Sequence, residues 1–143
     1  MKRIPTIKTV MTPFPFSIEA SADIAEARRR MEEHGIRHLP VLVDGEPIGI
    51  LSNRDLERAE AAMAVAGDPH PAPVGDVCRF PAYAVQLDEP LDNVLIHMAT
   101  ERVGSALVLR GEKIVGIFTT TDACRLFAEY LRRDFPADGD DAA

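Results

Sequence analysis

Two short sequence motifs place a hydroxyl three residues before a carboxylate. They are GILSNRD, with Ser52 and Asp55, and GIFTTTD, with Thr119 and Asp122. These residue types cap helices, because the first amide groups of a helix have no partner within it. The same helix start also suits a ligand, since its unpaired amides attract phosphate. A carboxylate there can accept hydrogen bonds from two sugar hydroxyls. From the residues alone, capping and ligand binding both remain open.

Both motifs belong to a repeat that spans most of the chain. A constant offset of 67 residues aligns Val10 with Val77 and Met31 with Met98, with no gap between. Two units of this length indicate a duplicated domain and not a solenoid. Half of the chain lies near the lower size limit for independent stability, so we expect each repeat to need the other to complete its core.

Apolar spacing and turn signals predict the order β-α-β-β-α in both repeats, an α+β (α/β) fold class. In the first repeat we expect an extended segment at 17–18, a helix that Ser21 caps and that ends at His34 before Gly35, strands over 39–43 and 48–51, and a helix over 55–66. In the second repeat we expect an extended segment at 83–87, a helix with Leu91, Val94, Leu95 and Met98 on one face, strands over 106–109 and 113–118, and a helix over 122–132.

This pattern divides the chain into repeats at 1–66 and 76–133. A proline-rich connector at 67–75 joins them, and an acidic tail at 134–143 is expected to be disordered. The run Arg28-Arg29-Arg30 lies on a predicted helix with glutamates nearby, which indicates a solvated and internally compensated face.

Charge and composition exclude several classes of protein. The formal net charge of −7 opposes broad binding to nucleic acid or anionic membrane. No apolar run reaches membrane-spanning length, and the N-terminus lacks the apolar core of a secretion signal, so we expect a cytoplasmic protein. Cys78 and Cys124 match no metal-ligand spacing, and we expect buried free thiols. The sequence shows no nucleophile with an adjacent base, no metal cluster and no glycine loop that could cradle phosphate. We therefore expect neither an enzyme nor a bound cofactor.

The sequence resembles the cystathionine-β-synthase (CBS) domain family in its two G-h-x-[ST]-x-x-D motifs, where h is a hydrophobic residue. Each motif closes a hairpin such as RHLPVLVDGEPIGILSNRD. The sequence patterns of that family also fit the segments VMTP, EHGIRHLPV and RVGSALVL. The resemblance covers about residues 8–133. It implies a tandem CBS pair, or Bateman module, with two clefts related by a pseudo-twofold axis. In layout the chain is similar to acetoin-utilisation-type CBS proteins without their extra C-terminal domain.

Such modules commonly bind adenosine-containing ligands, and the resemblance implies roles by position. Asp55 and Asp122 would accept hydrogen bonds from ribose, Ser52 and Thr119 would face ribose or phosphate, and Arg37 and His38 would bind phosphate. Arg54 would reach phosphate or only cover its own helix. Gly104 and Ser105 replace Arg37 and His38 in the second repeat, which makes the clefts unequal. The other implied site residues surround the base or flank it: Thr12, Pro13, Phe14, Val41, Ile50, Pro81, Ala82, Tyr83, Val108, Ile117 and Thr121.

The sequence and the resemblance together predict a non-enzymatic regulatory module that senses AMP, ADP or ATP, with S-adenosylmethionine or NAD as further candidates. It would transmit occupancy to an unidentified partner protein, without nucleic acid, membrane or metal. We expect a homodimer through the helices at 24–34 and 91–101 and parts of the C-terminal helices, because a two-layer repeat cannot bury every helix within one chain. The alternative is a protein-interaction or dimerisation module in which the two aspartates only cap helices.

Overall fold

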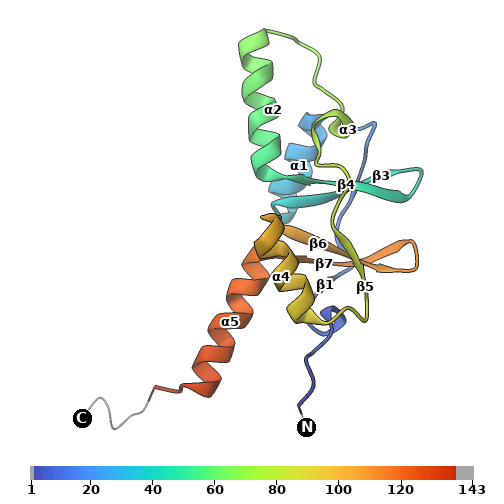
Figure 1. The fold of residues 1–143 in the computed structure, drawn as a ribbon. Coiled ribbons are helices and arrows are strands. Elements are labelled where there is room, and N and C mark those ends of the chain that lie inside the picture. The colour runs from blue at the N-terminus through green and yellow to red at the C-terminus, as the bar shows by residue number, and fades with distance from the viewer. Residues whose placement is uncertain (1, 138–143) are drawn as a thin grey trace.

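The computed structural model describes residues 2–137 and contains the β-α-β-β-α order twice, which confirms the predicted fold class. The two halves are stacked on one another, and the last helix runs away from the body (Figure 1). The first half contains η1 (Ile7–Thr9), β1 (Thr12–Pro13), β2 (Ile18–Glu19), α1 (Ile24–His34), β3 (His38–Val43), β4 (Glu46–Ser52) and α2 (Asn53–Ala66). The second half contains α3 (Val74–Val77), β5 (Ala84–Gln86), α4 (Leu91–Glu101), β6 (Ser105–Arg110), β7 (Lys113–Thr119) and α5 (Thr120–Asp134).

Helix α1 begins later than its sequence predicts. Asp23, and not Ser21, is the N-cap, and its side chain accepts the Glu26 N–H at 2.9 Å. The residues before Asp23 are held elsewhere, because the Ala20 N–H donates to a carbonyl of β3 and the Ala22 carbonyl accepts from α3. The helix ends at Gly35, as predicted, with the left-handed φ of 62° that glycine adopts without strain.

The C-terminal helices are longer than predicted. Helix α2 begins at Asn53 with Ser52 as its N-cap, two residues before the expected start at Asp55. Helix α5 continues to Asp134, past the expected end at 132 and into the predicted tail. The rest of that tail, from residue 138 onward, lies outside the described residues.

The strands form a three-stranded sheet in the order β2-β3-β4 and a four-stranded sheet in the order β1-β7-β6-β5. Helix α1 connects the parallel pair β2 and β3, and α4 connects the parallel pair β5 and β6. Each hairpin is antiparallel, and its register shifts after Val41 in the first repeat and after Val108 in the second. The 67-residue repeat therefore extends to the irregularities of the backbone.

The leading segment of each repeat pairs with the last strand of the other repeat. Thr12 in β1 lies opposite Ile117 in β7. Reciprocally, Arg79 and Ile50 in β4 exchange two backbone hydrogen bonds, of 2.9 and 3.0 Å. Each repeat thus extends the sheet of the other, and neither sheet is complete without both repeats.

The leading segment of each repeat also contributes a residue to the hydrophobic core of the other repeat. Ile7 is fully buried in the core of the second repeat, beside Val94 and Phe118. Val74 is fully buried in the core of the first repeat, although it lies in the predicted connector at 67–75. The two hydrophobic cores therefore do not follow the predicted boundaries at 66 and 76. These boundaries stay a prediction about the sequence repeats.

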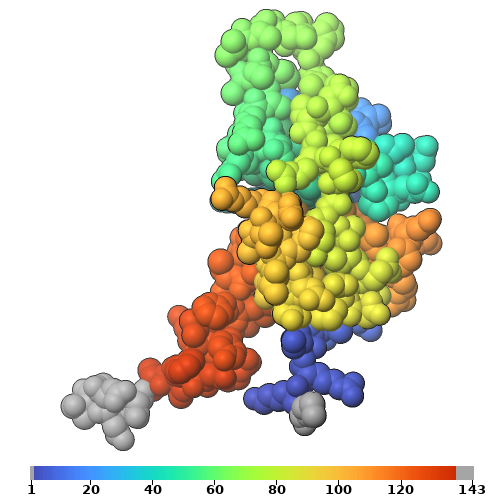
Figure 2. All heavy atoms as spheres, viewed as in Figure 1, coloured from blue at the N-terminus to red at the C-terminus, as the bar shows by residue number. Residues whose placement is uncertain are grey.

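A third cluster joins the two sheets. Ile50, Leu107 and Ile117 form this cluster between the repeats, with Ala82 and Ile114 packed against it. In the space-filling view the two halves form one continuous body, from which α5 projects (Figure 2).

Because Ile7 completes a core in the other half of the chain, Ile7→Ala should lower the free energy of unfolding by about 2–5 kcal/mol. Ile4 is 56% exposed, so Ile4→Ala is a matched control and should change stability by less than about 0.5 kcal/mol. Urea denaturation of both variants measures the difference. Equal stability of the two variants would contradict the exchange of leading segments.

Candidate functional site

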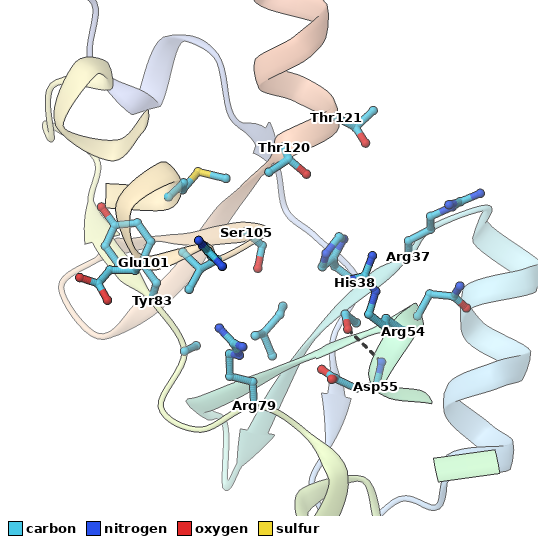
Figure 3. A pocket seen from close by; sticks show the side chains of 18 of the residues that line it. Arg37, His38, Arg54, Asp55, Arg79, Tyr83, Glu101, Ser105, Thr120 and Thr121 are labelled. Atoms are coloured by element: carbon cyan, nitrogen blue, oxygen red, sulfur yellow. Dashed lines mark hydrogen bonds between the residues drawn. The ribbon is translucent and has the colours of Figure 1, made fainter. Parts of the chain in front are cut away.

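A cleft of about 1240 Å³ lies between the two repeats. Its walls come from the starts of β3, α2 and α5, the segment before β5, and the connection from α4 to β6 (Figure 3). The exchange of leading segments builds this cleft, because the Arg79–Ile50 pairing brings the segment before β5 beside the start of α2.

Most of the predicted site residues line this one cleft. Those from the first repeat come from the end of the α1–β3 connection, from β4 and from the start of α2, whereas those from the second repeat come from the segment before β5 and the start of α5. The predicted residues in the lining are Arg37, His38, Ile50, Ser52, Arg54, Asp55, Pro81, Ala82, Tyr83 and Thr121.

The remaining predicted residues lie at the pseudo-symmetric position. Thr12, Pro13, Phe14, Ile117, Thr119 and Asp122 belong to β1, β7, α5 and their connections, and they do not line the cleft. Val41 and Val108 are fully buried in the cores of their own repeats, so their implied place around adenine is wrong. The pleat of each strand turns them toward the helices and away from the cleft.

The carboxylate of Asp55 is free among the described residues. Ser52 caps α2 by itself, since its hydroxyl accepts the Asp55 N–H at 3.1 Å. No hydrogen bond or ion pair within residues 2–137 involves the Asp55 carboxylate, which lies half-buried in the cleft lining. An acceptor without a protein partner beside a cleft can receive hydrogen bonds from a ligand.

The carboxylate of Asp122 is fully engaged. It accepts the Thr119 N–H at 2.8 Å and the Thr119 hydroxyl at 3.0 Å, and the Thr119 oxygen accepts the Asp122 N–H in return. Arg125 pairs with its other oxygen at 3.3 Å. The capping interpretation of the sequence therefore describes Asp122, where a full capping box is formed.

The glycine of each repeated motif lies against the leading segment of the other repeat. A β-carbon on Gly49 would lie 2.5 Å from the backbone carbonyl oxygen of Arg79, so only glycine lets this segment reach β4. A β-carbon on Gly116 would lie 2.2 Å from the sulfur of Met11, so a larger residue there would force the Met11 side chain to move.

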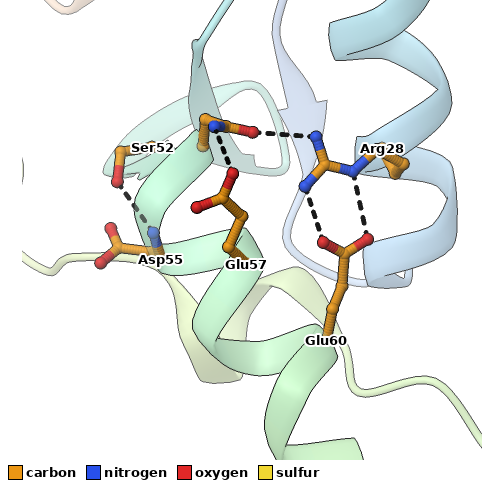
Figure 4. A network of polar contacts seen from close by, with 6 residues as sticks. Arg28, Ser52, Asp55, Glu57 and Glu60 are labelled. Atoms are coloured by element: carbon orange, nitrogen blue, oxygen red, sulfur yellow. Dashed lines mark hydrogen bonds and ion pairs between the residues drawn. The ribbon is translucent and has the colours of Figure 1, made fainter. Parts of the chain in front are cut away.

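A polar network fixes the start of α2 beside the cleft (Figure 4). Arg28 in α1 donates to both carboxylate oxygens of Glu60, at 2.6 and 3.1 Å, and to Asn53 Oδ1 at 2.8 Å. Glu60 raises the pKa of Arg28 through these bonds. Arg29 and Arg30 pair with Glu26 on the same helix, which agrees with the predicted compensated face. Arg28 instead ties α1 to the first turn of α2.

His38 reaches from the first repeat to the second. A β-carbon on Gly104 would lie 3.7 Å from His38 Nε2, so the imidazole faces the start of β6. Gly104 and Ser105 therefore line the same cleft as Arg37 and His38, and do not define a separate one. Burial lowers the pKa of His38, while the charges of Asp122 and Asp55 oppose this shift.

Several lining residues were not predicted from the sequence. His97 is one of them, and it stacks on the predicted Tyr83 with ring centroids 3.8 Å apart; burial raises the pKa of Tyr83. Arg102 ends α4 at a left-handed φ of 54°, and it occupies the position of Gly35 in the first repeat. The 67-residue alignment could have identified this arginine, since it replaces a glycine that a helix end favours. The other unpredicted charged side chains in the lining are Glu57, Arg58 and Glu101.

Comparison with known proteins identifies both repeats. Residues 7–62 and 74–129 each match the family model described as "CBS domain". A curated relative, L-aspartate semialdehyde sulfurtransferase from Methanocaldococcus jannaschii, is 26% identical over 126 residues. That alignment covers 87% of this chain but only 23% of the relative.

Solved structures share the fold. The CBS domain pair of protein MJ0100, in complex with 5′-methylthioadenosine and S-adenosyl-L-methionine, has a TM-score of 0.79 at 25% identity and covers 90% of this chain and 99% of its own. A structure from Vibrio cholerae assigned as an acetoin utilization protein (AcuB) has a TM-score of 0.76 at 23% identity and covers 95% and 99%. The predicted CBS pair and its similarity in layout to acetoin-utilisation proteins are confirmed.

Both cysteines are free thiols, but Cys78 is only partly buried and Cys124 is exposed, so the predicted burial of both is wrong. Within residues 2–137, no helix is both long and apolar enough to cross a membrane. No group of three or more histidine, cysteine or acidic side chains there could hold a metal ion.

Burial of neutral His38 should make stability depend on pH. Its folded pKa is below the unfolded value of about 6.5, so below that pH the unfolded chain binds more protons and stability falls as the pH is lowered. Above about pH 6.5 the imidazole is neutral in both states and contributes no such dependence.

Chemical denaturation of the wild type and His38→Asn at pH 7.5 and 5.5 tests this. The wild type should lose more stability than His38→Asn on acidification, whereas a variant of the exposed His70, His70→Asn, should behave as the wild type does. An equal loss in all three proteins would contradict the assignment.

Proposed function

The chain belongs to the CBS domain family, and from this membership we propose that it is a regulatory module that binds an adenosine nucleotide in the cleft at Asp55. Occupancy of the cleft would be transmitted to a partner protein. A related CBS pair in complex with two adenosine-containing ligands supports this proposal.

The free carboxylate of Asp55 is the observation that carries the proposal. This carboxylate takes no part in capping α2, because the hydroxyl of Ser52 is the group that accepts the Asp55 N–H. Ribose offers two adjacent hydroxyl donors, and hydrogen bonds to an ionised carboxylate are stronger than those between neutral groups. Asp55 would therefore hold the ribose, with the base toward Ile50 and the segment that contains Tyr83, and phosphate toward Arg37, His38 and Arg54.

The pseudo-symmetric position would not bind a ligand in the same way. Asp122 already accepts hydrogen bonds from Thr119 and Arg125, so ribose would have to displace protein partners. We expect one nucleotide per chain, in the Asp55 cleft. AMP, ADP and ATP are the principal candidates, and S-adenosylmethionine and NAD are outcomes that a binding panel would also detect.

The proposed role is regulatory and not catalytic. The CBS pair fold is generally regulatory, and the sulfurtransferase relative extends far beyond the portion that this chain matches. A cytoplasmic location and the existence of a regulated partner protein stay predictions from the sequence.

Assembly as a homodimer is part of the proposal. The apolar stripe of α1 packs within its own chain, since Ile24, Ala27 and Met31 are buried. Five of the exposed large apolar side chains lie on α4 and α5, and they are Leu95 and Ile96 on α4 and Phe127, Tyr130 and Leu131 on α5. An exposed apolar helix face of this kind indicates an interaction surface.

The same surface favours the alternative function, a protein-interaction module without nucleotide binding. Helix α5 has no buried residue and is strongly amphipathic. The alternative requires that the cleft stays without a nucleotide in solution, whereas the proposed function requires binding. A panel of nucleotides in a thermal-shift assay separates the two, since a ligand at 100 times its dissociation constant stabilises the fold by about 2.7 kcal/mol.

Alanine substitutions of the two aspartates should have opposite effects. Asp55→Ala should weaken nucleotide binding by about 1.5–3 kcal/mol, roughly tenfold to more than a hundredfold, and change stability little because Ser52 keeps the cap. Asp122→Ala should lower stability by about 0.5–2 kcal/mol through loss of the capping box and leave affinity unchanged. Isothermal titration calorimetry measures affinity, and urea denaturation measures stability.

Each variant serves as the control for the other. Unchanged affinity in folded Asp55→Ala would contradict the ribose assignment. An equal loss of affinity in Asp122→Ala would mean that the second position also binds the ligand.

The purified protein should have twice the 15.7 kDa mass of the chain in light scattering. Phe127→Glu should shift it toward the monomer, because this side chain is 61% exposed and a charge would oppose burial at an interface. Val43→Glu is a control at an exposed apolar site at the end of β3, outside the predicted interface helices. A wild type that is monomeric at every concentration would refute the dimer.

A further inference from the structure

The cleft at Asp55 concentrates positive charge in a chain that is acidic overall. The formal net charge of the chain is −7. The lining nevertheless contains three carboxylates, of Asp55, Glu57 and Glu101, and five guanidinium groups, of Arg37, Arg54, Arg58, Arg79 and Arg102. A cleft with an excess of one charge raises the local concentration of ligands with the opposite charge.

These five arginines have no protein partner among the described residues. No side-chain hydrogen bond or ion pair within residues 2–137 involves any of them. Elsewhere, Arg28, Arg30 and Arg125 each pair with a carboxylate of the chain. The cleft arginines therefore keep their full hydrogen-bonding capacity, and the planar guanidinium group matches two phosphate oxygens at once.

Arg102 adds a second observation. It adopts a left-handed conformation with φ of 54°, where its counterpart in the first repeat is Gly35 with φ of 62°. A β-carbon is disfavoured in this conformation, so the helix end itself gains nothing from arginine in place of glycine. Its side chain lies in the lining of the cleft, where it adds a cation.

The cations come from both walls of a large cleft. Arg37, Arg54 and Arg58 belong to the first repeat, and Arg79 and Arg102 belong to the second. The volume of about 1240 Å³ exceeds the usual range of roughly 300–1,000 Å³ for small-molecule sites. The cleft therefore has room for a nucleoside together with an extended anionic group.

We infer that the ligand of the Asp55 cleft is an adenosine polyphosphate, ADP or ATP, whose phosphate chain contacts arginines of both repeats. The inference rests on the proposed function for the nucleoside and adds the charge class of the ligand. Adenosine offers the arginines no anion, and the sulfonium of S-adenosylmethionine adds a positive charge to a cationic cleft. Polyphosphate binding would also remove the mutual repulsion of the guanidinium groups.

Calorimetric titrations at one pH and ionic strength, without added Mg²⁺, test the inference. The ligands are ATP, ADP, AMP, adenosine, S-adenosylmethionine and inorganic tripolyphosphate. ATP and ADP should bind at least tenfold more tightly than adenosine and S-adenosylmethionine, and more tightly than AMP. The affinity for ATP should also fall more steeply with added salt than the affinity for adenosine. Affinities of AMP, adenosine or S-adenosylmethionine equal to that of ATP would overturn the inference.

Arginine variants identify the source of the preference. Arg79→Gln should weaken ATP binding at least tenfold and leave adenosine binding unchanged. Arg102→Gly should do the same while it restores the residue that the helix end favours, so a loss of affinity there cannot be ascribed to a damaged fold. Arg110→Gln, at the exposed end of β6 outside the cleft, is the matched control and should bind ATP as the wild type does.

The outcomes separate this inference from the proposed function. Tight adenosine binding with no effect of the arginine variants on ATP would overturn the inference and leave the proposed function intact. Tripolyphosphate binding as tight as that of ATP, without adenosine binding, would overturn the proposed function and keep only the anion-binding role of the arginines. Absence of binding by all six compounds would overturn both.

Discussion

The reciprocal pairing of leading segments with the last strands of the opposite repeats is the interaction on which this structure depends. Two backbone hydrogen bonds between Arg79 and Ile50 hold one segment, and the pairing of Thr12 with Ile117 holds the other. The pairing completes both sheets, delivers a buried apolar residue to each core, and places residues of the second repeat beside Asp55. A single repeat would lack part of its sheet, part of its core and one wall of the cleft.

The pseudo-twofold symmetry of the backbone does not extend to the chemistry of the two helix starts. Asp55 and Asp122 occupy equivalent positions, yet only Asp122 closes a full capping box and pairs with an arginine. Ser52 caps α2 without a hydrogen bond to the carboxylate of Asp55. Two copies of one motif therefore divide the functions that the motif can serve: one carboxylate stabilises a helix, and the other is left available at a cleft.

Helix α5 connects the cleft with an exposed apolar surface. Helix α5 begins with Thr120 and Thr121 in the cleft lining and then leaves the body of the protein with Phe127 and Tyr130 exposed (Figure 1). A ligand that contacts the first turn of α5 touches the same rigid element that carries the apolar face. On the opposite wall, Arg28 of α1 holds the first turn of α2 through Asn53 and the following turns through Glu60.

Apolar periodicity and turn residues are local signals, so the sequence predicted the duplicated α+β fold, the order of the elements and the equivalence of the two repeated motifs. The motifs made Asp55 and Asp122 candidate residues, and the resemblance to CBS domains added Arg37 and His38. Tertiary structure alone decided which candidates share a cleft and which aspartate is free. Those properties depend on hydrogen bonds and packing between segments far apart in the chain. The Arg79–Ile50 pairing therefore had no local signature, and the repeat alignment marks Arg102 as unusual without showing that it lines the cleft.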